Sequence, residues 1–261
     1  MNRAPLEVTR IEQAAVGGWR LTVLASTGST NTDLLAAAAT GAPDRSVLAA
    51  ELQTGGRGRL DRAWSSPAGA GLTFSVLLRP SAPVSSWGWL PLLAGLALRR
   101  TVGAGAWLKW PNDLLLGPED GKVAGILAQA AGDAVVVGVG LNVTLTAAEL
   151  PVPTATSLAL QGVEQLDRSA LLAGFLTEFD TVLNRWLAAG ADAEAGGLAD
   201  EYRAGCRTIG QQVSVQLPDR TVTGRALAVD PAGRLVLQPD GGGPAQAIAA
   251  GDVTHIRPIS R

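Results

Sequence analysis

Two lysines are the first residues of this 261-residue sequence with a chemical signature. Of its 21 basic residues, 19 are arginines, and the exceptions are Lys109 and Lys122. A lysine ammonium is a compact point charge that fits beside one carboxylate or phosphate oxygen, whereas arginine presents a planar fork. We therefore expect the two lysines to bind a charged ligand, with chance usage as the alternative.

Polar residues interrupt an apolar segment, 107–116, that is predicted to be one strand. Lys109, Asn112 and Asp113 lie around Pro111, which cannot donate a hydrogen bond to a strand ladder. A strand that breaks its own pattern is typical of a functional site, and an irregular edge strand is the alternative. Lys109 can neutralise a carboxylate or phosphate, and the other two can bind a cation or hydroxyl groups.

The glycine-rich segment 53–71 shows no regular periodicity and is predicted to be a long loop, a feature that is usually functional. Arg57, Arg59 and Arg62 place positive charge on it, and its glycines free the backbone to wrap a ligand. The pattern favours closure over a phosphate, with a flexible surface loop as the alternative. No Gly-Lys-Ser/Thr follows, so this is not a Walker A loop.

Two further motifs could bind small polar groups. Ser29-Thr30-Asn31 begins a predicted helix that ends at Gly41, where hydroxyls and free N–H groups can bind a polar ring or an anion. A plain helix cap, with Thr30 and Asp33 as a capping-box-like pair, explains this motif equally well. In a predicted strand, Gly138 and Gly140 would let a flat ligand lie on the backbone, and Asn142 could read a base or ureido edge.

The elements that must position these residues predict an α+β fold with a mixed or antiparallel sheet and flanking helices. Helices are expected after Ser29 and over 91–100 and 167–189; strands are expected over 21–25, 46–52, 72–78, 107–116, 123–130 and 134–143, the last three as an antiparallel meander. From Gly210 the apolar period changes to two, which predicts a small β-barrel with strands over 213–217, 222–229, 234–238 and 247–249. We expect a larger domain over residues 1–207 and a smaller one over 208–261.

Composition excludes several classes of protein. With 47% hydrophobic and 17% charged residues, intrinsic disorder is excluded. The longest uncharged apolar stretch, 87–98, falls short of the roughly 20 residues that span a bilayer, and no secretory signal is evident. Cys206 is the only cysteine, which excludes an internal disulfide, and the single histidine, His255, is expected on the surface or in an edge strand. We expect a soluble cytoplasmic protein; its net charge of −2 offers no general attraction for nucleic acid.

Taken together and in order, the motifs resemble biotin–protein ligases. The residues that carry the resemblance are Ser29-Thr30-Asn31, Gly56-Arg57-Gly58-Arg59, Lys109-Trp110-Pro111-Asn112-Asp113-Leu114, Lys122 to Leu127 and Gly138 to Asn142. The resemblance covers roughly residues 20–260, and the Lys-Trp-Pro-Asn-Asp run with the arginine loop is its most specific part. It implies an α+β catalytic domain and an SH3-like C-terminal domain.

The resemblance also implies roles for individual residues. Biotin would be bound by Ser29, Thr30, Asn31, Gln53, Arg57, Gly58, Arg59, Lys109, Gly138 and Gly140. ATP would be bound by Trp64, Asn112, Asp113, Lys122 and Asn142, with Asp113 as a ligand of Mg²⁺. The catalytic residues would be Lys109, at the biotin carboxylate and the reacting phosphate, together with Arg57 and Arg59 on a loop that orders over the adenylate.

The implied reaction has two steps, in which biotin and ATP form biotinyl-5′-AMP and biotin then passes to a lysine of a biotin carboxyl carrier protein or domain. The expected cofactors are ATP and Mg²⁺, no nucleic acid or membrane partner is expected, and the protein would be a monomer or weak homodimer. Two positions depart from the family pattern, because Asp61 stands where glycine is common and Gln129 where glutamate is.

Three alternatives differ in class. A biotin-sensing repressor needs a DNA-binding module, for which the 28 residues before Ser29 are too few. The Lys-Trp-Pro-Asn-Asp run argues against a lipoate- or octanoyl-transferring relative. An inactive biotin-binding module is disfavoured because Lys109, Arg57 and Arg59 are all present.

Overall fold

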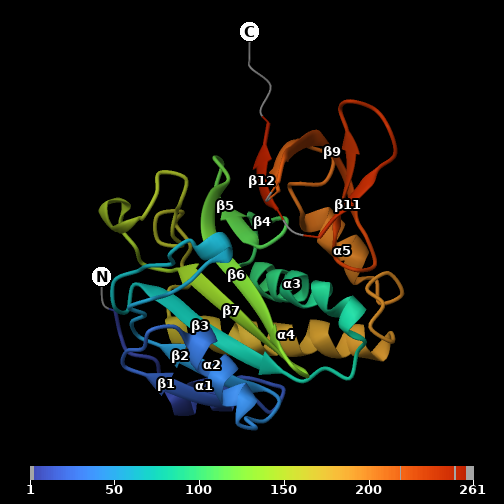
Figure 1. Cartoon of the computed structure of the whole chain (residues 1–261). Coiled ribbons are helices and arrows are strands. Elements are labelled where there is room, and N and C mark those ends of the chain that lie inside the picture. The colour runs from blue at the N-terminus through green and yellow to red at the C-terminus, as the bar shows by residue number, and fades with distance from the viewer. Residues whose placement is uncertain (1–2, 218, 250, 257–261) are drawn as a thin grey trace.

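The computed structural model describes residues 3–217, 219–249 and 251–256 of the chain, with the exception of the Asp61 side chain. Two sheets and the helices around them make up the fold (Figure 1). The helices are α1 (Val8–Ala14), α2 (Thr30–Ala39), α3 (Leu90–Val102), α4 (Arg168–Ala188) and α5 (Leu198–Gly205). The larger sheet contains β1 (Arg20–Leu24), β2 (Ser46–Ala50), β3 (Gly71–Leu78), β4 (Ala106–Lys109), β5 (Asp113–Leu116), β6 (Gly121–Ala131) and β7 (Ala134–Asn142).

The larger sheet has the strand order β1-β2-β3-β7-β6-β5-β4. Only the β1–β2 pair is parallel, and the other neighbours are antiparallel. Strands β5, β6 and β7 follow one another in the chain and in the sheet, which confirms the expected meander. The predicted α+β class with a mixed sheet is likewise confirmed.

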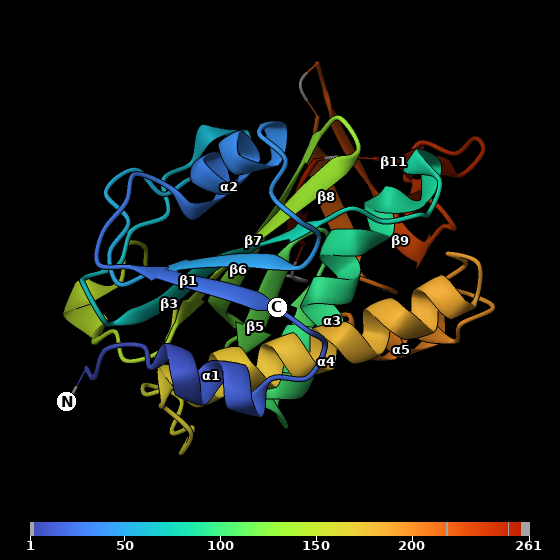
Figure 2. The ribbon, with the colours of Figure 1, turned by 90° about the horizontal axis from the view of Figure 1, so that it is seen from below.

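The two faces of this sheet have different neighbours. Helix α2 covers one face, and α1, α3 and α4 cover the other (Figure 2). Along β7, alternate residues from Val135 to Leu141 enter the core beneath α3 and α4. On the opposite face, Ala134 and Val136 pack under α2, but Gly138, Gly140 and Asn142 line a cavity. Because side chains alternate along a strand, one face of β7 is thus half core and half cavity floor.

Helix α4 supplies the longest apolar stripe of the core, as its 3.6-residue pattern predicts. Phe175 lies edge-on to Phe74 of β3 with ring centroids 4.9 Å apart, and it stacks on Phe179 at 5.3 Å. Phe179 in turn stacks on Trp19 at 6.1 Å. Asp167 begins the helix by accepting hydrogen bonds from the N–H groups of Ser169 and Ala170.

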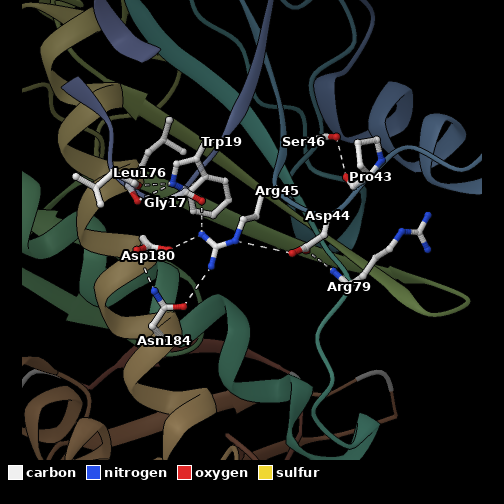
Figure 3. Close-up of polar contacts among 11 residues, drawn as sticks. Gly17, Trp19, Pro43, Asp44, Arg45, Ser46, Arg79, Leu176, Asp180 and Asn184 are labelled. Carbon is white, nitrogen blue, oxygen red and sulfur yellow. Dashed lines mark hydrogen bonds and ion pairs between the residues drawn. The ribbon is translucent and has the colours of Figure 1, made fainter. Parts of the chain in front are cut away.

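Arg45, the residue before β2, links this side of the sheet to α4 (Figure 3). Its guanidinium forms an ion pair with Asp180, donates to the carbonyl of Gly17 at 2.7 Å and donates to Asn184 Oδ1 at 3.2 Å. The same group lies 4.9 Å from the centroid of the Trp19 ring. These contacts explain why a non-glycine residue is held at a φ of 63°.

The C-terminal sheet has the order β11-β10-β9-β8-β12 and is antiparallel throughout. Its strands are β8 (Gln212–Gln216), β9 (Thr221–Val229), β10 (Leu235–Pro239), β11 (Gln246–Ile248) and β12 (Asp252–His255). Its 230–233 turn docks on the larger domain, where the indole N–H groups of Trp89 and Trp110 donate to the carbonyls of Asp230 and Gly233. The expected C-terminal β domain is confirmed, with five strands rather than the four predicted; its SH3-like character and the boundary at residue 208 remain predictions.

The structure corrects several predicted elements. The single strand expected over 107–116 is two strands, β4 and β5, because Trp110-Pro111-Asn112 forms the turn between them. Ser29, rather than Thr30, caps α2. Helices α1 and α5 and strand β12 were not predicted. In the described part of the chain, no helix combines the length and apolar character that crossing a membrane requires.

Candidate active site

The floor of the cavity is formed by three residues on one face of β7, namely Gly138, Gly140 and Asn142. A Cβ atom added to Gly138 would lie 2.1 Å from Asn31 Oδ1, and one added to Gly140 would lie 2.3 Å from the Trp64 ring. The two glycines therefore make room for side chains of the protein itself, rather than directly for a flat ligand as expected. Along the floor, Asn31 marks one end, Trp64 the middle and Asn142 the other end.

The Asn31 end of the cavity is uncharged and rich in hydrogen-bonding groups. Gln53 Oε1 accepts a hydrogen bond from the Thr30 N–H at 2.8 Å and lies 3.0 Å from the Thr30 hydroxyl. That hydroxyl is 2.7 Å from Ser75 Oγ, which donates to Asn31 Oδ1 at 2.6 Å. The Asn31 amide donates to Gln129 Oε1 at 2.9 Å, so the departure at Gln129 provides an amide partner for Asn31.

Thr30, Asn31 and Ser75 are buried, and buried polar groups linked in this way hold one another in fixed orientations. Ser75 was not predicted as a member of this set, and its only signal in the sequence is a serine inside the largely apolar strand β3. Ser29, whose Oγ accepts from the Thr32 N–H, completes the polar end where α2 begins.

The glycine-rich loop folds back on itself over the middle of the cavity. The Trp64 N–H donates to the Gly56 carbonyl at 2.9 Å, and the Gly58 N–H donates to the Arg62 carbonyl at 2.6 Å. Arg57 pairs with Ala63 in an isolated bridge. These bonds bring Arg57, Gly58 and Trp64 to the cavity as predicted from their place on the loop.

Arg59 joins the loop to the hairpin formed by β4 and β5. Its Nη1 donates to Asn112 Oδ1 at 3.4 Å, and the Asn112 amide donates in turn to the Ile126 carbonyl at 3.1 Å. Burial lowers the pKa of the Arg59 guanidinium from its ordinary value, while the Asp113 carboxylate opposes this shift. Asn112 therefore has a positioning role in this structure, between the loop and β6.

Lys109, Asp113, Gly125 and Gly140 lie in one row across four neighbouring strands. The row runs directly to the place where Trp64 covers Gly140, so Lys109 lies at the edge of the site's middle section. The turn that follows Lys109 is anchored because the Trp110 N–H donates to Thr208 Oγ1 at 3.0 Å. This anchoring fixes the lysine relative to the cavity.

Lys122 and Asn142 define the end of the cavity opposite to Asn31. The Lys122 ammonium lies 2.6 Å from Asp113 Oδ1 and 5.8 Å from the centroid of the Trp64 ring. Asn142 is buried, and its amide donates to the Thr156 carbonyl at 2.9 Å. The segment around Thr156, which was not predicted as part of the site, closes this end by pairing with Lys122.

Asp113 is the residue predicted to bind a metal. Its Oδ1 is buried and forms an ion pair with Lys122 Nζ at 2.6 Å. Nowhere in the described ranges do three or more His, Cys, Asp or Glu side chains gather as they would around a metal ion. The donor set thus fits a cation held by one carboxylate, with its other ligands supplied by a substrate.

The C-terminal sheet also contributes to the cavity wall. Asp252 of β12 forms an ion pair with Arg62 of the glycine-rich loop. His255, at the end of the same edge strand, lies with Nε2 3.1 Å from Thr208 Oγ1, which confirms the expected edge-strand position. Asp252 was missed because β12 itself was not predicted.

All fifteen residues selected from the sequence line one cavity of about 1630 Å³. An uncharged polar pocket, a cationic loop and a lysine-bearing hairpin therefore belong to a single site. A site of this kind, on a mixed α+β domain beside a small β domain, defines a two-domain protein that binds an organic group together with an anion.

Comparisons with known proteins place this class within a family. Residues 23–143 match the Biotin/lipoate A/B protein ligase family, and residues 208–255 match the Biotin protein ligase C terminal domain. The chain is 45% identical over 269 residues to the biotin--[acetyl-CoA-carboxylase] ligase of Mycobacterium tuberculosis, a match that covers 98% of this chain and 97% of that protein. It is 31% identical to the bifunctional ligase/repressor BirA of Bacillus subtilis, over 84% of this chain and 69% of that one.

A solved structure agrees with this result. The biotin protein ligase from Aquifex aeolicus in complex with biotin and ATP superposes with a TM-score of 0.73 and 26% identity, over 92% of this chain and 99% of that chain. The chain therefore belongs to the biotin protein ligase family, which confirms the resemblance noted in the sequence.

Proposed function

We propose that this chain is an ATP-dependent biotin–protein ligase that biotinylates a lysine of a biotin carboxyl carrier protein or domain. In the first step, a biotin carboxylate oxygen attacks the α-phosphorus of ATP, and the bond to the bridging oxygen of the β-phosphate breaks, which releases pyrophosphate. In the second step, the lysine amine attacks the acyl carbon of biotinyl-5′-AMP, the acyl C–O bond breaks, AMP leaves, and the amine proton passes to water.

One observation carries the proposal: a single cavity joins an uncharged hydrogen-bonding end to a group of cations, with Trp64 between the two. Ser29, Thr30, Asn31 and Gln53 suit the ureido ring of biotin, which offers both donors and acceptors but carries no charge. Biotin bound there would direct its carboxylate along the floor toward Lys109.

The cations suit the reacting anions. Lys109 and Arg59 would neutralise the biotin carboxylate and the α-phosphate, whose mutual repulsion otherwise opposes the first step. Arg57 and Gly58 would enclose the adenylate from the loop. Trp64 in the middle of the cavity and Asn142 at its far end would bind adenine. Lys122 would bind the phosphates, together with Asn112 on the ATP side.

Asp113 would hold Mg²⁺ together with oxygens of the ATP phosphates, as one-carboxylate magnesium sites commonly do. The bound ion would supply charge neutralisation for the leaving pyrophosphate. Lys122 would then exchange Asp113 for phosphate as its partner. The Asp113 carboxylate, which lines the cavity beside Lys122, supports this assignment.

Neither step needs a nucleophile from the protein, which suits a cavity whose nearby histidine is bonded to Thr208. Positioning and charge neutralisation supply the catalysis instead. Closure of the loop would keep water from the mixed anhydride. The carrier protein, the monomeric or weakly dimeric state and the cytoplasmic location remain predictions.

The test is pyrophosphate release from ATP with biotin or with lipoate as the acid, followed by labelling of a carrier domain. We expect pyrophosphate release with biotin but not with lipoate. We also expect labelling of a carrier domain, but not of a carrier-domain variant whose acceptor lysine is replaced by arginine. Equal release with lipoate would favour the lipoate-transferring alternative. Biotin binding without pyrophosphate release would show an inactive binding module.

A further inference from the structure

A cross-domain ion pair connects the glycine-rich loop to the C-terminal sheet. Arg62 Nη2 contacts Asp252 Oδ2, and Arg62 Nη1 donates to Asp252 Oδ1 at 3.4 Å, so both guanidinium nitrogens face the carboxylate. Most of the Arg62 side chain is exposed, with 63% of its surface accessible, against 39% for Asp252. The contact is therefore open to solvent and can form and break without unfolding either domain.

Asp252 faces more than one cation of the site. The hydrogen bond from Arg62 is the main cause of its lowered pKa, and the charges of Lys109 and Arg59 lower that pKa further. The carboxylate thus stays ionised at neutral pH and lies within the electrostatic reach of the groups proposed to hold the adenylate. Through the Asp252 carboxylate, the C-terminal domain makes a charged contact with the glycine-rich loop.

The loop's internal hydrogen bonds pass this restraint on to the ligand-facing residues. The Arg62 carbonyl accepts from the Gly58 N–H, and the Arg62 N–H donates to the Arg59 carbonyl at 3.2 Å. Trp64, two residues further on, is tied to Gly56. Holding Arg62 therefore also holds Arg59 beside Asn112 and Trp64 against Gly140.

We propose that Asp252 is a positioning residue that keeps the glycine-rich loop closed through Arg62 and so slows escape of biotinyl-5′-AMP. The inference rests on the proposed function for its ligand, but the contact itself lies between two residues of the protein. Because an exposed pair is weak, Asp252 biases closure without locking the loop, which leaves the carrier lysine able to reach the adenylate. The C-terminal domain thereby acts on the chemistry of the larger domain.

The decisive measurement is the release rate of radiolabelled biotinyl-5′-AMP from the full-length enzyme after an unlabelled chase. We expect Asp252→Asn to release the adenylate about two- to five-fold faster, the range of an exposed ion pair, and Asp252→Glu to restore slow release. Asp240→Asn, which changes a carboxylate of the same sheet that pairs with Gln212 away from the cavity, should leave release unchanged. A release rate for Asp252→Asn equal to that of the unsubstituted enzyme would overturn the proposal.

A double-mutant cycle separates the contact from a general effect on the C-terminal domain. Arg62→Gln should speed release by itself, and adding Asp252→Asn should produce no further increase. Independent, additive effects of the two changes would also overturn the proposal.

Limited trypsin digestion provides a readout that needs no catalysis. In the ligand-free protein, Asp252→Asn should speed cleavage after Arg57 and Arg59 by a similar factor, whereas Asp240→Asn should not. If the unsubstituted enzyme formed no adenylate, the proposed function would fail, and the digestion alone would still decide whether Asp252 holds the loop. Equal digestion of all three proteins would refute that role.

Discussion

The indole ring of Trp64 lies against the backbone of Gly140, at a place where any larger residue would overlap it. A Cβ atom at Gly140 would lie 2.3 Å from the ring, and one at Gly125 on the neighbouring strand would lie 3.1 Å from it. Gly125 and Gly140, on two adjacent strands, thus leave a flat surface, the glycine seat, on which the Trp64 ring packs. The position of the ring on this seat fixes where the cavity divides into its two ends.

Gly140→Ala should displace Trp64 from this seat and disturb the ATP side of the site. We expect KM for ATP to rise about 10–100-fold, the effect of misplacing a binding group by an ångström or so, with a smaller change in KM for biotin. Steady-state pyrophosphate release with each substrate varied in turn measures the two constants. Gly241→Ala is the matched control, because no atom lies within 4 Å of its added Cβ. An unchanged KM for ATP would mean that Trp64 does not contact the nucleotide.

Gly138→Ala should have the opposite selectivity. The new methyl group would lie 2.1 Å from Asn31 Oδ1, which must then leave its hydrogen bond with Ser75. Since a buried polar group without its partner is costly, we expect KM for biotin to rise about tenfold or more and KM for ATP to change little. Isothermal titration with biotin alone checks the result without nucleotide. Parallel increases in both constants would contradict the division of the cavity.

The sequence predicted the membership of the site better than the geometry within it. Every selected residue reaches the cavity, because motif spacing reflects which strands carry polar groups. The packing role of Gly138 and Gly140 could not be predicted from the sequence. The side chains that fill the space beside them are those of residues 31 and 64, which lie far away in the chain. Lys109 was placed inside a strand although it ends one, because a run of apolar residues hides the turn at Trp110-Pro111-Asn112.

Two of the missed elements, α1 and β12, share a physical cause. Helix α1 is seven residues long and buries one residue completely, Ile11, so it shows no periodic stripe. Strand β12 is four residues long, and its partner β8 lies more than thirty residues earlier in the chain. Short elements stabilised by distant partners leave little local pattern, and Asp252 was missed for this reason.

Lys109→Ala should abolish most adenylate formation and leave the fold intact. The Lys109 side chain lines the cavity, and no side-chain hydrogen bond or ion pair joins its ammonium to another residue of the described ranges. Loss of the ammonium therefore removes transition-state stabilisation and little else. We expect pyrophosphate release to fall by about 10²–10³-fold, and Lys109→Arg to fail as well, because a planar fork does not replace a point charge. Unfolding curves that match the parent, with Arg225→Ala as the surface control, would separate chemistry from stability. Near-normal release by either variant would refute this role.

Arg45→Ala should lower stability without changing the site. The substitution leaves the Asp180 carboxylate, whose side chain is 12% exposed, without its guanidinium partner and removes the contact with Trp19 (Figure 3). We expect a loss of about 2–3 kcal/mol in the free energy of unfolding, below the range for fully buried pairs because Arg45 is itself 23% exposed. Denaturant unfolding measures the loss, and Arg10→Ala, which breaks the exposed pair with Asp167, should have a much smaller effect. Equal effects of the two variants would contradict the anchoring role of Arg45.

Arg59→Gly should still form the adenylate but release it early. Arg59 is the loop arginine that reaches the β4–β5 hairpin, through Asn112, and its loss removes one of the contacts that offset the cost of ordering a glycine-rich loop, roughly 1–2 kcal/mol per residue. Released biotinyl-5′-AMP acylates exposed lysines on any protein nearby. Mixing the variant with biotin, ATP and serum albumin should therefore label the albumin, whereas the parent enzyme and Arg220→Gly, a change at an exposed turn, should leave it unlabelled. If the variant forms the adenylate at a normal rate and the albumin stays unlabelled, Arg59 does not retain the intermediate.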